Sequence, residues 1–598
     1  MMRWFSQWIP MIVALLAALC AGPARAQEAL PAGGEPVFED ALAALGEFEN
    51  ARGSAQIVSV DGPGFARAIR VTSKERGESW DLQVNAALPK GVEKGEVMLL
   101  TFWARTIRTV DESEQGIFRA AAGLSRAPWT KSLQRTMTVG GDWTQFVLPF
   151  RSRDSYDPGG MNMALEVGST VQAIEFGDVR LLSYGDRVSL DALPRTRVTY
   201  PGRAPDAAWR AEAEQRIRAN RMAPFTVRVV DAGGAPVEGA RVHVRMTRQA
   251  FQFGCAFRAW YVVDQEEPAS RFYQEKIPEL FNAGSFVNSL KWPPWSGDWG
   301  EQHSREASLK ALQWVKDHGL TFRGHVLVWP SWQHLPQYMR EYRENPNPEA
   351  IRKEVLDHID SITTATRGYV SEWDVINEPF HNHALMDICG RDVMVDWFKR
   401  ARRNLPDAGL SLNDFGILTA LTDSPHQQNY EETIQYLLDN GAPLTVLGLQ
   451  GHFGGTAPGP ARIYATLERY ARFGLPMRVT EFTMGTNDEQ LQADFLRDCM
   501  TVLYSHPSVI GLQFWGPGQL FTRDFQEKPN LRAYRELVFN KWWTDETGRT
   551  DGAGDFSGRG FLGRCEATVT LGDRRATHEF ELAKPTAYTT VIVELPGE

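Results

Sequence analysis

Two glutamates end short hydrophobic segments, and together they could form a catalytic pair. Glu378 follows the segment 373–377 (WDVIN) and precedes Pro379, and Glu481 stands in the similar segment 479–482 (VTEF). A carboxyl group at the end of a strand lies at the rim of a parallel barrel. Two carboxyl groups at one rim can cleave a glycosidic bond, since one protonates the leaving oxygen while the other attacks the anomeric carbon. A rim salt bridge is the alternative for either glutamate alone, and the matching motifs favour the catalytic pair.

An alternation of strand-like and helical segments surrounds the two glutamates. Eight short apolar segments, each followed by a helical stretch, occur between about residues 251 and 539. The strand candidates are 251–257, 284–287, 321–328, 373–376, 409–412, 445–449, 477–482 and 509–515. Eight such units over this length predict an α/β fold, a (β/α)8 or TIM barrel, whose chemistry lies at the carboxyl ends of its strands. Glu378 and Glu481 would then follow strands 4 and 7, nearly opposite each other across the barrel mouth.

Regions of β-type pattern flank the barrel in the sequence. Residues 36–185 show short alternating stretches between Gly, Pro and Asp, which predicts an N-terminal β-sandwich. Residues 186–224 have the pattern of a linker that contains a polar helix. Segment 225–248, before the barrel at 250–540, and segment 544–598, after it, each have too few strands to bury a face. We therefore expect these two segments to join in one small accessory β-sandwich.

Composition narrows the functional classes. The chain has 598 residues, 43% of them hydrophobic and 23% charged, as is typical of a globular protein of several domains. A formal net charge of −10 argues against binding the phosphate backbone of nucleic acid. Nineteen Trp residues are many for this length, and flat aromatic faces line sugar-binding clefts as well as cores. The composition therefore favours a carbohydrate partner over nucleic acid.

The N-terminus has the pattern of a signal peptide over residues 1–26. Arg3 supplies a positive flank, residues 9–19 form an apolar run too short to span a bilayer, and residues 24–26 (ARA) match a cleavage site. Cys20 raises a lipoprotein alternative, which the bulky residue before it disfavours. We therefore expect a secreted or periplasmic protein, a monomer with no membrane partner after cleavage.

The cysteines that remain after cleavage are scattered along the chain: Cys255, Cys389, Cys499 and Cys565. They form no CxxC pair and no His cluster accompanies them, so neither a metal nor another cofactor is expected. His381 and His383, just after the first glutamate, are better explained by solvation at the rim than as metal ligands. An exported protein can form disulfides, but the scattered positions favour buried free thiols.

Residues 250–540 resemble glycoside hydrolase family 10, the endo-β-1,4-xylanase family. The further motifs, in barrel order, are 287–292 (VNSLKW), 323–329 (RGHVLVW), 413–414 (ND), 450–452 (QGH) and Trp515. The resemblance implies a retaining mechanism on xylan or a related hemicellulose, with Glu378 as acid/base and Glu481 as nucleophile. The other substrate-binding or supporting residues that it implies are Asn288, Lys291, Trp292, His325, Trp329, Asn377, Gln450, His452 and Trp515.

The residue types suit these roles on physical grounds. Asn377 can hydrogen-bond the sugar 2-hydroxyl, a contact that strengthens in the transition state. His452 can hold Glu481 ionised, because a hydrogen bond to a carboxylate favours its charged form. Glu378 must stay protonated until it donates, which an apolar setting promotes. Lys291 and His325 can donate to sugar hydroxyls. For these two residues and for His452, packing or surface solvation is the alternative.

Residues 36–185 resemble, more loosely, the carbohydrate-binding modules that accompany such xylanases. The likeness rests on 143–146 (WTQF) and 173–179 (AIEFGDV). Three tryptophans are candidate sugar platforms, although a place in the sandwich core is the favoured interpretation: Trp80, Trp103 and Trp129.

The barrel motifs depart from the family pattern at several positions. Val287 stands where a Glu is usual, and Pro330 and Trp332 replace polar sugar contacts. Thr483 replaces the Asp that normally backs the histidine beside the nucleophile, and only Trp515 is evident after strand 8, where a second Trp is usual. These lost hydrogen bonds predict a modest xylanase, or one tuned to a decorated chain.

Two other functions stay open. A related barrel glycosidase that acts on another β-glycan, in exo or endo mode, would keep the same pair of glutamates. A non-catalytic glycan-binding protein would have lost one of them, so the presence of both Glu378 and Glu481 argues against it.

Overall fold

The computed structural model describes residues 30–196, 199–263, 268–420, 423–486 and 488–597. The predicted signal peptide, residues 1–26 with Cys20, lies outside the described residues. Within the described ranges, no helix is both long and apolar enough to cross a membrane.

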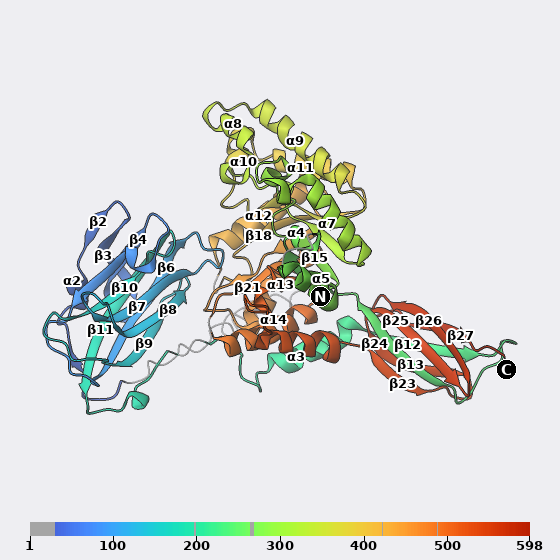
Figure 1. The fold of residues 1–598 in the computed structure, drawn as a ribbon, viewed down its shortest axis with the longest axis horizontal. Helices are drawn as coiled ribbons and strands as arrows, with labels where there is room; N and C mark the ends of the chain where they lie inside the picture. Colours follow the sequence, from blue (N-terminus) through green and yellow to red (C-terminus); the bar gives the residue numbers. More distant parts are fainter. Residues whose placement is uncertain (1–29, 197–198, 264–267, 421–422, 487, 598) are drawn as a thin grey trace, which may run out of the picture. The chain divides into compact units, whose positions relative to one another are not determined.

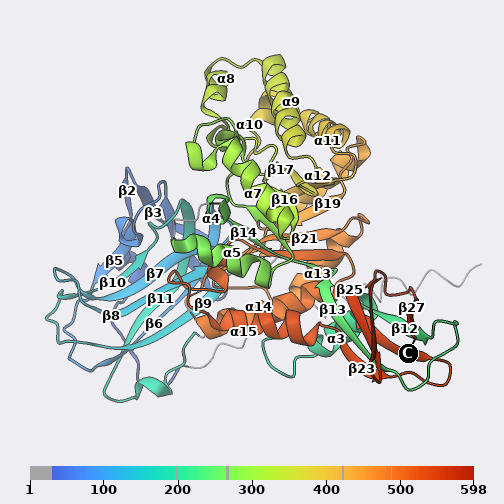
Figure 2. The same cartoon turned by 45° about the vertical axis from the view of Figure 1, so that its right-hand side comes forward.

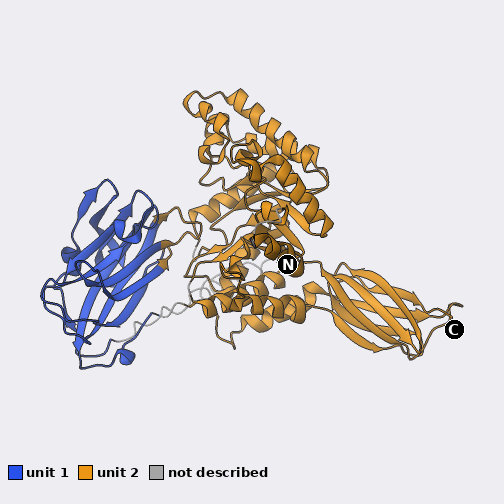
Figure 3. Ribbon diagram, viewed as in Figure 1, with its two compact units in different colours: residues 1–107, 117–137, 142–197 blue, residues 108–116, 138–141, 198–598 orange. Residues whose placement is uncertain are grey.

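The chain divides into two compact units (Figure 3). Unit 1 comprises residues 1–107, 117–137 and 142–197, and unit 2 comprises residues 108–116, 138–141 and 198–598. Two short segments, Arg108–Gly116 and Thr138–Gly141, therefore belong to unit 2 although unit 1 surrounds them in the sequence.

Unit 1 consists of two antiparallel sheets (Figure 1). One has the strand order β2-β3-β4-β11-β6-β9, with β1 paired to β11, and the other has the order β5-β10-β7-β8. The strands are β1 Glu35–Pro36, β2 Phe48–Asn50, β3 Gly53–Gly62, β4 Phe65–Ser73, β5 Gln83–Ala87, β6 Val97–Thr109, β7 Gly116–Leu124, β8 Lys131–Val139, β9 Thr144–Arg151, β10 Met161–Glu166 and β11 Gln172–Gly185. Phe102 and Phe176 of the first sheet contact Phe118 of the second at ring-centroid distances of 5.7 and 5.2 Å. The sheets thus face each other across an aromatic core, and the predicted N-terminal β-sandwich is confirmed.

Two of the three tryptophans considered as sugar platforms are placed differently from the expectation. A core position is wrong for Trp80 and Trp129, which are 49% and 56% exposed. Trp80 lies in a short 3₁₀ turn and Trp129 in the loop after β7, where no pleated strand directs a side chain inward. Trp103, on β6, is half-buried and packs against Phe65 at 6.4 Å between ring centroids.

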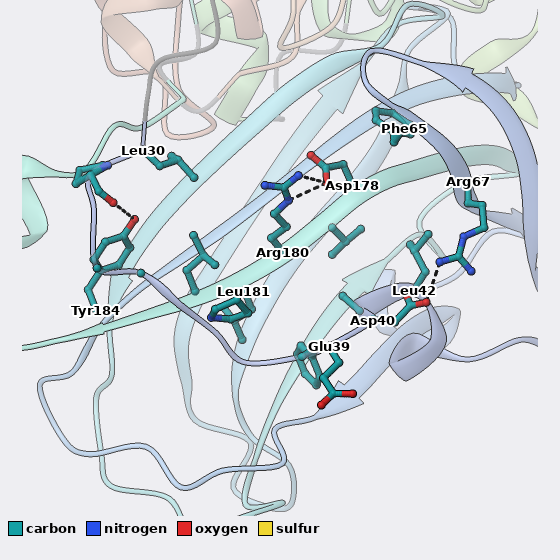
Figure 4. Close-up of a pocket in the computed structure, with 18 of the residues that line it drawn as sticks. Leu30, Glu39, Asp40, Leu42, Phe65, Arg67, Asp178, Arg180, Leu181 and Tyr184 are labelled. Carbon is teal, nitrogen blue, oxygen red and sulfur yellow. Dashed lines mark hydrogen bonds and ion pairs between the residues drawn. The ribbon is translucent and has the colours of Figure 1, made fainter.

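Unit 1 also contains an open pocket of about 800 Å³ (Figure 4). The N-terminal segment and strands β4 and β11 line it. Its arginines are already paired, since Arg67 lies 2.8 Å from Asp40 and Arg180 lies 2.7 Å from Asp178. Among its described residues, the pocket therefore offers no free guanidinium group to a ligand.

Unit 2 contains a closed barrel of parallel strands (Figures 1 and 2). The order β19-β18-β17-β16-β15-β14-β22-β21 closes through the pairing of β19 with β21, and the two-residue strand β20 pairs with β21. The strands are β14 Gln252–Phe257, β15 Ala283–Phe286, β16 Thr321–Gly324, β17 Glu372–Asn377, β18 Gly409–Asp414, β19 Val446–Leu449, β20 His452–Phe453, β21 Met477–Met484 and β22 Val509–Phe514. Strands such as β17 and β19 are buried along their whole length, which explains their near-continuous apolar runs. The predicted (β/α)8 barrel is confirmed.

Helices connect the barrel strands. The longer ones are α5 Pro268–Leu280, α7 Arg305–Asp317, α9 Pro348–Ala365, α11 Val393–Asn404, α12 Pro425–Asp439, α13 Pro460–Ala471, α14 Glu489–Ser505 and α15 Pro529–Arg535. Four of them begin at a side chain that accepts a backbone N–H of the first turn: Ser304, Asn347, Ser424 and Asp488. Such caps stabilise the helix start and fix where each loop ends. The loops that lead into these four helices are therefore anchored at both ends.

The linker helix and the two flanking β segments also lie in unit 2. Helix α3, Trp209–Arg221, matches the predicted polar helix and is tied to α14 by a 2.7 Å ion pair between Arg210 and Asp498. Strand β12 (Met222–Val230) lies between β24 (Asp555–Phe561) and β27 (Thr589–Glu594). The second sheet has the order β23-β13-β25-β26, with β13 Arg241–Gln249, β23 Asp545–Arg549, β25 Gly563–Leu571 and β26 Arg574–Leu582. The two segments share one hydrophobic core, so the predicted accessory sandwich is confirmed.

Removal of the C-terminal tail tests how much this sandwich contributes to stability. A chain that lacks residues 548–598 would lose β24 to β27 and expose the buried side chains of Phe225, Val242 and Val244. We expect its melting temperature to fall by roughly 5 °C or more in differential scanning calorimetry. A chain that lacks only residues 596–598 is the control, and equal melting temperatures for the two truncations would contradict the expectation.

The four cysteines of the described residues are free thiols, and all four are buried: Cys255, Cys389, Cys499 and Cys565. Buried free thiols are what the scattered positions of these cysteines predict.

Candidate active site

Glu378 and Glu481 lie at the carboxyl ends of barrel strands 4 and 7, β17 and β21. Glu378 follows β17 directly, and Glu481 lies within the last half of β21. Both are buried, at 6% and 4% exposure. Glu378 has a φ of 55°, a left-handed conformation that costs a non-glycine residue about 1–3 kcal/mol. Its backbone N–H donates to the carbonyl of Asn413 at 2.8 Å, which helps to hold that conformation.

Side-chain amides connect the two carboxyl groups. Asn413 donates from Nδ2 to Glu481 Oε1 at 3.0 Å and to Asn377 Oδ1 at 2.8 Å. Gln450 donates from Nε2 to Glu378 Oε1 at 2.8 Å and to Asn377 Oδ1 at 3.3 Å. A short buried network therefore runs from one glutamate to the other and fixes their relative geometry. The predicted contact of Asn377 with a sugar hydroxyl stays a prediction.

Glu481 is held in its charged form. His452 Nε2 lies 3.3 Å from Glu481 Oε2, and His325 Nδ1 lies 3.9 Å from Glu481 Oε1. Burial would raise the pKa of Glu481, but the hydrogen bond from His452 and the charges of His325, His452 and Arg323 lower it to about 2. Thr483 Oγ1 lies 3.0 Å from His452 Nδ1, so a hydroxyl backs this histidine where the family resemblance expects a carboxylate.

Glu378 is held in its neutral form. Burial is the main cause that raises its pKa to about 8, and it outweighs the hydrogen bond from Gln450. The negative charges of Asp414 and Glu481 act in the same direction. Two carboxyl groups in one site thus have pKa values displaced in opposite directions, which is the arrangement that separates a general acid from a nucleophile.

Several predicted residues gather near Glu481. Lys291 Nζ donates to Asn288 Oδ1 at 3.0 Å, and it lies 5.0 Å from the ring centroid of Trp329. Burial lowers the pKa of Lys291. Trp515, directly after β22, lies 5.3 Å from His325 between ring centroids. These side chains combine cationic donors with aromatic faces, which suits recognition of a neutral sugar.

Trp292 is placed apart from this group. It begins the short helix α6, Trp292–Trp295, where it is 4% exposed and stacks on His358 at 4.3 Å between ring centroids. The stacked histidine covers its ring, so this position suits a supporting role.

Some site residues were missed from the sequence. Asn382 donates from Nδ2 to Glu378 Oε2 at 3.2 Å, four residues after the acid. Asp374 is fully buried on β17, and its Oδ2 lies 2.7 Å from His325 Nδ1, which orients the ring. Asp374 could have been found, because a charged residue inside an otherwise apolar strand needs a buried partner.

The segment Arg108–Gly116 was also missed. Glu112 Oε2 lies 3.5 Å from His452 Nε2, and Glu114 Oε1 lies 2.6 Å from His426 Nδ1. The only local signal is an acidic stretch, 111–115 (DESEQ), that interrupts the alternating β pattern.

The fold and the two glutamates together place the barrel in the class of glycoside hydrolases. Residues 244–532 match the family model described as Glycosyl hydrolase family 10. This part of the chain is therefore a glycosyl hydrolase family 10 domain, as its motifs suggested.

Individual relatives are distant and cover the chain in part. Endo-1,4-beta-xylanase 1 of Arabidopsis thaliana is 28% identical over 369 residues, which are 60% of this chain and 38% of the relative. Anti-sigma-I factor RsgI6 of Acetivibrio thermocellus is 27% identical over 373 residues, 61% of this chain and 47% of the relative. The chain thus spans less than half the length of these two relatives. Among solved structures, xylanase 10B from Thermotoga petrophila in complex with xylobiose is 22% identical, with 49% of this chain and 95% of that chain covered and a TM-score of 0.43.

Proposed function

We propose that this protein is an exported, retaining endo-glycosidase that cleaves β-1,4-linked xylan-type polysaccharide by double displacement. The observation that supports this most is the opposite displacement of the pKa values of Glu378 and Glu481, at the carboxyl ends of two barrel strands. Membership of the family 10 domain and similarity to xylanases support the choice of substrate class.

The first step forms a bond between the anomeric carbon and Glu481. The ionised Glu481 attacks that carbon while Glu378 gives its proton to the glycosidic oxygen, so the leaving sugar departs as an alcohol. In the second step, Glu378 is ionised and takes a proton from water, which attacks the same carbon and releases Glu481. Two inversions at one centre give net retention of the β configuration.

The surrounding groups have distinct tasks in these steps. Asn413 and His452 hydrogen-bond different oxygens of Glu481, which leaves the carboxylate fixed in orientation as it attacks. Gln450 keeps Glu378 in place through the change from acid to base. Because Thr483 offers His452 a hydroxyl and no charge, we expect a slower enzyme than one with a carboxylate there.

Product analysis on purified glycans tests the proposal. The protein would be incubated with linear xylan, substituted xylans and β-glucans, and an NMR time course would follow the anomeric protons of the first products. We expect β-configured xylo-oligosaccharides from xylans and little release from glucans. Release of α-anomers would contradict double displacement, release of single sugars from chain ends would indicate an exo mode, and binding without cleavage would indicate a glycan-binding protein.

A further inference from the structure

The segment Arg108–Gly116 is fixed to the barrel by two residues that follow Glu112, Glu114 and Gln115. Beyond Glu112, the carboxylate of Glu114 lies 2.6 Å from Nδ1 of His426, whose Nε2 lies 3.0 Å from the buried carboxylate of Asp414 on β18. Burial disfavours the charged form of His426, but these two carboxylates outweigh it and raise the pKa of His426 to about 10. A charged histidine therefore joins the segment to strand 5 of the barrel across the neutral pH range.

A second attachment involves the loop after β20. The side chain of Gln115 donates to the carbonyl of Thr456 and accepts from its N–H at 3.2 Å. Thr456 N–H also donates to Thr138 Oγ1 at 2.9 Å, so both short segments of unit 2 meet at this threonine. Glycines make room for the contact, because a Cβ on Gly416 would lie 2.5 Å from Glu114 Cδ and one on Gly454 would meet Gln115 Oε1.

Glu112 is thereby placed beside the nucleophile. Its Oε2 lies 3.5 Å from His452 Nε2, the same nitrogen that lies 3.3 Å from Glu481 Oε2. The turn that presents it is closed by Asp111, which accepts from the N–H of Ser113 at 3.0 Å and from the N–H of Glu114 at 2.9 Å. The side chain of Glu112 is 54% exposed, so part of its carboxylate remains open to a ligand.

A purely structural ion pair explains this placement poorly. The Glu112 partner of the ion pair with His452 is 54% exposed, so solvent screens the pair and it stabilises little. The neighbouring carboxylate of Glu481 repels a second negative charge. Desolvation and the charge of Glu481 both raise the pKa of Glu112. The carboxylate of Glu112 lies beside Glu481 and remains accessible, so it is suited to accept hydrogen bonds from the hydroxyls of a bound sugar.

We propose that Glu112 is a substrate-binding residue that contacts the sugar unit bound beside Glu481, and that its charge makes the site favour neutral sugar units over units that carry a carboxylate. This inference rests on the proposed function of the same site. It deepens that function, because it names which xylans the site selects: those whose sugar at this position bears no uronate branch.

Two variants test the inference. Glu112→Gln keeps the size and hydrogen-bonding ability of the side chain and removes its charge, and Glu546→Gln does the same to an exposed glutamate on β23. For Glu112→Gln, we expect kcat/KM on linear xylohexaose to fall about tenfold, as one charged hydrogen bond is weakened. The wild type should have a higher kcat/KM on xylohexaose than on an oligosaccharide with a uronate branch. The ratio of these two values should be smaller in Glu112→Gln by about fivefold or more. Glu546→Gln should match the wild type in both respects.

The pKa of His452, measured by NMR, separates the placement of Glu112 from its role. It should fall in Glu112→Gln and stay constant in Glu546→Gln, whatever the substrate. An unchanged His452 pKa would overturn the inference by removing Glu112 from the site. A lowered His452 pKa with unchanged kcat/KM and unchanged selectivity would overturn its contact with substrate. A lowered His452 pKa in a protein that cleaves no glycan would instead locate the failure in the proposed function, and the inference would fall with it.

Discussion

Replacement of Glu481 by Ala is expected to lower kcat on xylan by roughly 10⁴- to 10⁶-fold, as removal of a nucleophile does in other covalent mechanisms. The loss should be this large because Glu481 is the group that forms the bond, and Asn413 and His452 hold its two oxygens in the orientation for attack. Kinetics on linear xylan and on an aryl β-xylobioside would measure the loss.

Added azide should restore cleavage in the Glu481→Ala variant. A small anion can occupy the space left by the carboxylate and attack the anomeric carbon from the same face, which gives an α-glycosyl azide from a β-linked dinitrophenyl xylobioside. The matched control is Glu378→Ala, in which the covalent intermediate still forms and azide attacks it from the opposite face, so the product should be the β-azide. A β-azide from the Glu481 variant would show that the two roles are assigned the wrong way round.

The barrel and its two glutamates could be predicted from the sequence because their signals are local. Eight apolar segments at regular intervals specify the strands, and Glu378 and Glu481 each stand at the end of a strand in a distinct motif. Because the barrel strands are parallel, their carboxyl ends all lie at the same end of the barrel, and this follows from the topology alone. The same reasoning placed β12 and the C-terminal strands in one sandwich, because neither could bury a face by itself.

The groups that tune the site could not be predicted in this way. Glu112 and Glu114 meet His452 and His426 across more than 300 residues of chain, and only the tertiary fold brings them together. The exposure of Trp80 and Trp129 was misjudged for a related reason, since composition does not say which loop residues a sandwich leaves uncovered. Strand motifs thus identify the reacting groups, whereas long-range contacts decide their electrostatic surroundings.

Replacement of Glu378 by Ala is expected to have an effect that depends on the leaving group. Xylan needs its leaving oxygen protonated, so kcat/KM on xylan should fall by about 10²- to 10⁴-fold. A dinitrophenolate leaves without a proton, so kcat/KM on dinitrophenyl β-xylobioside should change by less than about tenfold, while kcat falls because the second step lacks its base. An equal loss on both substrates would contradict the acid role.

The pH dependence should report the same two groups. Catalysis needs Glu378 protonated and Glu481 ionised, and their pKa values are displaced to about 8 and about 2. For the wild type, kcat/KM on xylobiosides with poor leaving groups should therefore be highest between these values, fall as the pH rises through about 8 and fall as it drops towards about 2. In Glu378→Ala with the dinitrophenyl substrate, kcat/KM should no longer fall near pH 8. The variant lacks the group that titrates there, and the dinitrophenolate leaves without a proton. If the fall near pH 8 persists in that variant, another group controls it, and the assignment of Glu378 as the acid would have to be abandoned.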